Sequence, residues 1–159
     1  MIRSVSFLLL AALVVAPSAS PAAPSDTIKI GTPFHYAGFS WSLTAISWVA
    51  KSNAKAAKVL SEPGCHADGD HGLLAFPFSV KSEQVGEGAG GMALFVTYKD
   101  GSSASFFVNM GGSGGADTYW VCDAPKPSKS NPIVSVKFGN GFNDAGYPKF
   151  FYLNNPTVQ

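Results

Sequence analysis

A short polar stretch in the middle of the chain carries residue types that bind metal ions. Residues 65–72 read CHADGDHG, with His66, Asp68, Asp70 and His71 crowded into a few positions. Imidazole nitrogens and carboxylate oxygens are ligands of zinc, imidazole also suits copper, and carboxylates alone suit calcium. The stretch therefore predicts a divalent metal site built from these four side chains. A catalytic version, such as a metal-dependent hydrolase, would also need an open coordination position for water.

The same stretch is also typical of a polar turn. Aspartate and glycine are ordinary turn residues, and a histidine beside them is often simply solvated. The two histidines do not have the spacing of a helical or zinc-finger site, and the closing glutamate of the helix-loop-helix calcium loop is missing. A third interpretation is a proton-sensitive switch based on His66 and His71. The sequence leaves these three interpretations open.

The N-terminal segment predicts export. Residues 1–22 combine a positive start, a short apolar run and small residues with prolines, which is the pattern of a signal peptide. The apolar run is shorter than the roughly 20 residues of a membrane-spanning helix, and no cysteine follows it to carry a lipid anchor. We therefore expect residues 23–159 to be a single periplasmic or extracellular domain. In an oxidising compartment, Cys65 and Cys122 are predicted to form a disulfide.

The charge balance limits the partners. The chain has 11 basic residues, of which Arg3 is the only arginine, and 10 acidic residues. Loss of the signal peptide would leave lysines and acidic residues in equal number. Nucleic-acid binding needs a basic face, and arginine is the usual two-point partner of carboxylates and phosphates. The composition therefore excludes a nucleic-acid partner and argues against two-point recognition of anions.

Alternating apolar residues predict a β-rich fold. Residues 39–44 alternate large apolar and hydroxyl side chains, and a change of phase at Ala45–Ile46 predicts a bulge. The runs 92–98 and 103–109 flank Asp100-Gly101, which predicts a hairpin. Further strands are expected at 73–81, 118–122, 133–138 and 149–153.

Two other features refine this interpretation. Pro77 cannot donate to a β-ladder, so the strand at 73–81 is predicted to lie at a sheet edge. Residues 53–61 are the one plausible helix, with Asn53 as its N-cap. About seven to nine short strands with almost no helix predict an all-β antiparallel sandwich, of immunoglobulin-like or jelly-roll type, with one disulfide. Residues 28–46 resemble the first strands of immunoglobulin-like exported bacterial domains, a resemblance that implies nothing about activity.

Aromatic residues suggest a different kind of site. Rings on the surface of a secreted sandwich can stack on sugars, whereas rings in an alternating pattern usually belong to the core. The candidates for such a ligand-binding platform are Trp48, Tyr119, Trp120, Phe142 and Tyr147. The loop 139–151 contains the last two.

These observations favour a non-catalytic, exported binding or accessory module whose ligand is an unknown protein or carbohydrate. No catalytic residue can be assigned from the sequence. The first alternative is a metal-binding protein that uses residues 65–72 and holds zinc, copper or calcium. The second alternative is a carbohydrate-binding domain. It differs from the binding module only because it names carbohydrate as the ligand.

Overall fold

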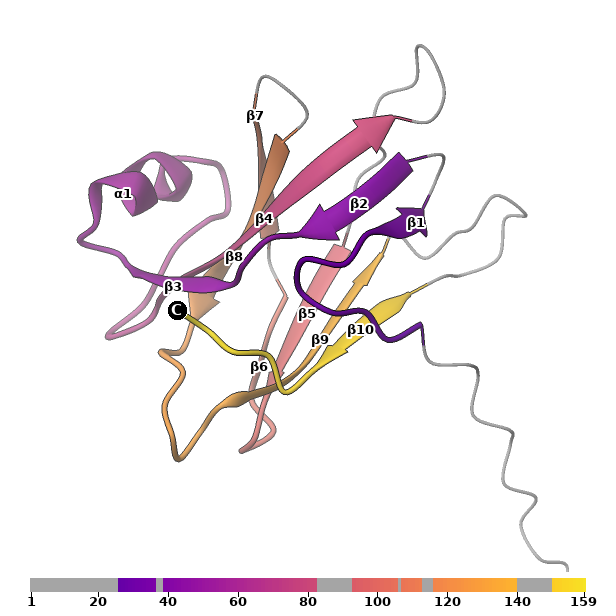
Figure 1. Ribbon diagram of the computed structural model, residues 1–159. Helices are drawn as coiled ribbons and strands as arrows, with labels where there is room; N and C mark the ends of the chain where they lie inside the picture. Colours follow the sequence, from indigo (N-terminus) through magenta and orange to yellow (C-terminus); the bar gives the residue numbers. More distant parts are fainter. Residues whose placement is uncertain (1–25, 37–38, 83–92, 106, 113–115, 140–149) are drawn as a thin grey trace, which may run out of the picture.

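The protein is a sandwich of two antiparallel β-sheets, as the sequence predicted (Figure 1). The computed structural model describes residues 26–36, 39–82, 93–105, 107–112, 116–139 and 150–159. These residues form ten strands and one short helix. The strand number exceeds the expected seven to nine for two reasons. The strand Phe34–Tyr36 was not predicted, and the runs that begin at residues 39 and 103 each form two strands. The predicted signal peptide, residues 1–22, lies outside the described residues.

The larger sheet has six strands. Its strands are β1 Phe34–Tyr36, β2 Phe39–Leu43, β3 Ser47–Ala50, β4 Gly72–Ser82, β7 Phe107–Gly112 and β8 Ala116–Ala124. The order is β1-β2-β4-β8-β7, and β3 pairs with β4 as well. Strand β4 is therefore central, with β2 and β3 in succession along one side and β8 along the other.

The smaller sheet has four strands in the order β10-β9-β5-β6. Their bounds are β5 Ala93–Tyr98, β6 Ser103–Ala104, β9 Ile133–Gly139 and β10 Phe151–Asn154. The predicted hairpin joins β5 to β6: Gly101 N donates to Tyr98 O at 3.0 Å, and Gly101 has a φ of +87°. The chain then leaves this sheet, because β7 pairs with β8 in the other one. One expected strand at 103–109 is thus shared between both layers.

Aromatic rings fill the space between the sheets. Phe78 of β4 lies at their centre, with its ring centroid 5.8 Å from those of Trp41, Tyr119 and Phe138. Phe138 comes from the smaller sheet, so these contacts join the two layers. All four side chains are almost completely buried. Edge-to-face and tilted ring pairs of this kind add about 0.5–1.5 kcal/mol each beyond the area they bury.

The predicted bulge is present between β2 and β3. Leu43 pairs with Phe78 and Ser47 pairs with Ala75, so residues 44–46 lie opposite the two residues 76–77 of β4. The extra residue shifts the alternation, as expected for a bulge.

The prediction that Pro77 places its strand at a sheet edge is wrong. Thr44 N donates to Pro77 O at 3.0 Å, so the carbonyl group of Pro77 points toward the bulge at residues 44–46. In an antiparallel strand, the N and C=O of one residue point to the same side. The position without an N–H therefore meets the irregular segment, and no regular ladder bond is lost.

The connection from β3 to β4 forms an extra layer on the outer face of the larger sheet. It contains α1, Ala54–Leu60, which begins after Asn53; the Asn53 side chain accepts from Lys55 N at 2.9 Å, as predicted for an N-cap. Figure 1 shows α1 beside the larger sheet, on the side away from β5, β9 and β10. Helix and sheet bury a second apolar cluster, separate from the main core: Ala56, Val59, Cys65, Leu73, Ala75, Trp120 and Cys122.

Candidate metal centre

The site begins with a bulge at the end of β8. Leu74 pairs with Val121 and Gly72 pairs with Ala124, so one residue of β4 lies opposite both Cys122 and Asp123. Asp123 has a φ of +54°, a left-handed conformation that aspartate tolerates better than most residues. Ala124 then returns to the main core. The bulge therefore lets Asp123 depart from strict alternation and project toward the outer layer.

The predicted disulfide brings this bulge to the 65–72 stretch. Cys65 and Cys122 are bonded, with their Cα atoms 5.6 Å apart. His66 follows one cysteine and Asp123 follows the other, so the crosslink fixes two potential ligands from distant segments beside each other. The described residues contain no free cysteine.

Backbone and side-chain donors hold the Asp123 carboxylate. Its Oδ1 atom accepts from Asp68 N at 2.9 Å and from His71 Nδ1 at 2.9 Å. The Asp68 N–H bond is the main cause that lowers the pKa of Asp123; the His71 hydrogen bond and the charges of His71 and His66 act in the same direction. The carboxylate is thus held in its ionised form.

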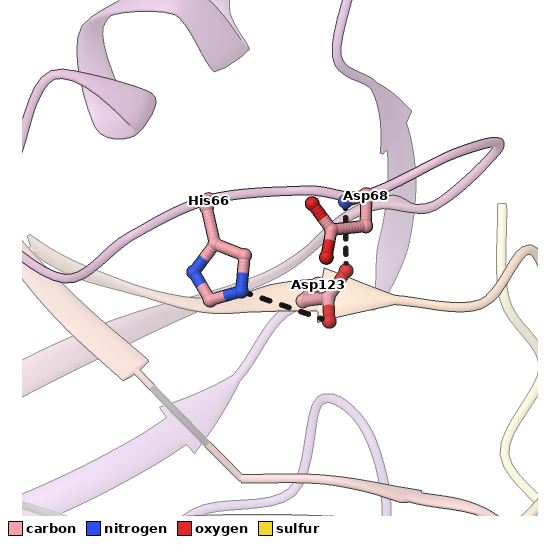
Figure 2. Close-up of side chains that lie close together, drawn as sticks. All are labelled: His66, Asp68 and Asp123. Carbon is pink, nitrogen blue, oxygen red and sulfur yellow. Dashed lines mark hydrogen bonds and ion pairs between the residues drawn. The ribbon is translucent and has the colours of Figure 1, made fainter.

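Asp123 also belongs to a small cluster of potential metal ligands. Asp123 Oδ2 lies 4.0 Å from His66 Nε2. His66, Asp68 and Asp123 each offer one ligand atom, and these atoms all lie within 4.8 Å of one another. Figure 2 shows the three side chains grouped together, with Asp123 on the strand and the other two on the loop above it.

This donor set matches zinc or copper better than calcium. One imidazole nitrogen and two carboxylate oxygens are ligands of these transition metals, whereas calcium takes six to eight oxygens. Around a tetrahedral zinc, ligand atoms are about 3.3 Å apart, given bonds of about 2.0–2.1 Å. The ligand atoms would have to approach one another by up to about 1.5 Å, and the exposed side chains of His66 and Asp68 can make this movement. Water or another ligand would complete the coordination.

The structure divides the four predicted ligands into three groups. His66 and Asp68 belong to the cluster, and His71 binds Asp123 Oδ1, where it orients the carboxylate. Such a histidine resembles the outer partners that position metal ligands. Asp70 is exposed and lies outside the cluster. Asp123 was missed by sequence reasoning, and the one signal for it is its place directly after Cys122.

The predicted aromatic platform is distributed over different parts of the molecule. Tyr119 lies in the main core and is 1% exposed, while Trp120 lies in the outer cluster. Trp48 is partly buried, and its Nε1 donates to Ala124 O at 3.2 Å. Phe142 and Tyr147 lie outside the described residues. Tyr119, Trp120 and Trp48 therefore do not belong to one common cluster.

Comparison of the chain with protein-family models, curated protein sequences and solved structures finds no match. Within the described part of the chain, no helix has the length and apolar character needed to cross a membrane.

Proposed function

We propose that this protein is an exported, non-catalytic binding module whose ligand is a divalent transition-metal ion, zinc or copper. The observation that carries the proposal is the convergence of His66, Asp68 and Asp123 from two segments joined by a disulfide. The disulfide itself supports export, because such bonds persist in oxidising compartments.

The openness of the cluster favours binding over catalysis. The His66 side chain is 65% exposed and that of Asp123 is 34% exposed. Catalytic metal sites usually lie in shaped cavities that exclude bulk water and orient the substrate. A surface ion held by three side chains would instead keep water ligands or accept a donor group from a partner. The arrangement is suited to capturing or displaying an ion.

The support around Asp123 also favours binding. A metal ligand must be deprotonated and well oriented, and the bonds from Asp68 N and His71 provide both conditions. The disulfide and the bulge fix the backbone on each side, so less conformational freedom is lost when the ion binds.

The test is metal binding by the mature, tag-free protein after treatment with chelator. We expect isothermal titration with zinc or copper to give one equivalent, and the melting temperature to rise with the bound ion. His66→Ala should lower the affinity by at least about tenfold, as for loss of a ligand. Asp70→Ala is the matched control, because it removes a carboxylate from the same loop but outside the cluster.

Three results would overturn the proposal. The first is a protein that shows no saturable binding of either ion. The second is an equal loss of affinity in Asp70→Ala and His66→Ala. The third is a His66→Ala variant that binds as tightly as the wild type, since the cluster would then not be the site.

A further inference from the structure

A second candidate site lies between α1 and β8, apart from the metal cluster. A hollow of about 440 Å³ opens there and is lined by Ala54, Lys55, Lys58, Val59, Thr118 and Trp120. This volume lies within the range of about 300–1,000 Å³ that is typical of small-molecule sites.

The geometry of the two elements explains the hollow. Ala56 and Val59 anchor α1 against the apolar end of the sheet, where Leu73 and Cys122 lie. Thr118 is two residues before Trp120 in β8, so both project from the same face of the strand. Residues of α1 form one wall of the hollow, and Thr118 and Trp120 of β8 form the other. Ala54, Trp120 and the buried Val59 provide the apolar part of its lining.

The described residues at the rim of the hollow carry positive charge only. Lys55 and Lys58 are three positions apart on α1, so they lie on neighbouring turns of the same side. Both are exposed, and within the described residues no carboxylate forms an ion pair with either ammonium group. Thr118 adds a hydroxyl. An apolar lining beside two ammonium groups complements a ligand with an apolar body and one anionic group.

We propose that this hollow binds small organic anions with an aromatic or aliphatic body, of which an aromatic carboxylate is the simplest. Ala54 and the accessible edge of Trp120 contact the body, and Lys55 and Lys58 attract the anionic group. Because lysines are point charges and offer no two-point fork, the site selects for charge more than for the shape of the anion. The site does not depend on the metal cluster.

The probe is 2-naphthoate, with neutral naphthalene-2-methanol as its uncharged counterpart, both titrated in the presence of chelator. The indole N–H resonances of the three tryptophans provide the readout, assigned with Trp48→Phe and Trp120→Phe. We expect a saturable shift of the Trp120 signal with a Kd of about 1 mM, as for a ligand of this size. Trp41 and Trp48 do not line the hollow, so their signals should move less.

The charge variants provide the decisive comparison. Lys55→Gln/Lys58→Gln should weaken 2-naphthoate at least about fivefold, in line with two exposed charge contacts. Lys99→Gln/Lys129→Gln removes the same charge from exposed positions elsewhere and should leave the Kd unchanged. The neutral alcohol should bind as weakly to the wild type as to the first double variant.

Each contrary result rejects the inference. An unresponsive Trp120 signal at 20 mM 2-naphthoate would show that the hollow does not bind this class. Equal effects of the two double variants would show that net charge, and not the hollow, attracts the anion. Equal affinity for acid and alcohol would remove the role of the two lysines. Because chelator is present throughout, none of these results depends on metal binding.

Discussion

His71 Nδ1 lies 2.9 Å from Asp123 Oδ1, and this contact holds the loop 65–71 against the end of β8. The two residues are 52 positions apart in the sequence. The disulfide between Cys65 and Cys122 and this hydrogen bond form two neighbouring ties between the same segments. His66 and Asp68 lie between Cys65 and His71 in the sequence, and Asp123 takes part in both the cluster and the second contact. The geometry of the candidate metal cluster and the stability of the segment 65–71 should therefore respond to the same substitutions.

Asp123→Ala should destabilise the protein more than Asp123→Asn. Alanine loses the acceptors for Asp68 N and His71, and its left-handed backbone costs about 1 kcal/mol or more. Asparagine tolerates this backbone and keeps an acceptor oxygen. We expect losses of about 2–3 kcal/mol for Ala and about 1 kcal/mol for Asn in urea unfolding. Asp70→Asn is the charge-matched control and should change stability by less than about 0.5 kcal/mol. Equal effects of the two Asp123 variants would contradict the role of the bulge.

The contribution of Asp123 to stability should disappear in acid. Its pKa in the folded state is lowered, first by the Asp68 N–H bond and then by His71 and His66. A lowered folded pKa gives stability that is present above the unfolded value of about 3.9 and is lost as the pH falls through the folded value. The stability difference between wild type and Asp123→Asn, measured from pH 6 to pH 2, should therefore shrink below about pH 4. A difference that stays constant to pH 2 would show that the carboxylate charge is not involved.

Removal of the crosslink should be costly. In the chain-entropy model, a disulfide that closes a loop of this length stabilises the fold by about 4 kcal/mol. We expect Cys65→Ala/Cys122→Ala to lose about this amount in denaturant unfolding and to bind zinc more weakly, because His66 and Asp123 are no longer tied together. A loss below about 1 kcal/mol with unchanged zinc affinity would mean that packing alone holds the outer loop.

Gly72→Ala tests the close approach of Trp48 to β4. A Cβ atom on Gly72 would lie 2.7 Å from the Trp48 ring and would also meet the backbone oxygen of Val49. Neither group can move freely, since Trp48 also donates to Ala124 O. We expect a loss of about 2 kcal/mol or more in denaturant unfolding, as for other overpacked positions.

Gly69→Ala is the matched control for this variant. Gly69 has a φ of +49°, and a Cβ atom at this position would meet nothing within 4 Å. Its substitution should therefore cost only the backbone strain of about 1 kcal/mol. Equal losses at Gly72 and Gly69 would contradict the steric explanation.

Much of the fold follows from local sequence patterns. Alternation predicted β2, the change of phase predicted the bulge before β3, and Asp100-Gly101 predicted the hairpin. Pro77 was misplaced because the sequence does not show what lies opposite each residue. The proline is accommodated in a central strand by a bulge in its neighbour, which is a property of the pairing and not of the strand itself.

The candidate site was harder to predict for the same reason. Asp70 has the same chemistry as Asp68 and lies only two residues away, yet it is outside the cluster. Asp123 lies in β8 at a position that strict alternation would turn toward the core, and only the bulge redirects it. The predicted Cys65–Cys122 bond was the available clue, because it makes the residues next to each cysteine neighbours.

The separation of the two apolar clusters suggests how the molecule opens. The helix α1 and the loop 65–71 pack on the outer face of the larger sheet, and the inner face of this sheet packs in the aromatic core. The outer layer can therefore detach in a local fluctuation while the sandwich stays closed. Amide hydrogens in α1 should exchange with deuterium sooner than those in β4 and β9. A bound ion would slow the exchange of the loop, and the core amides would keep their rates.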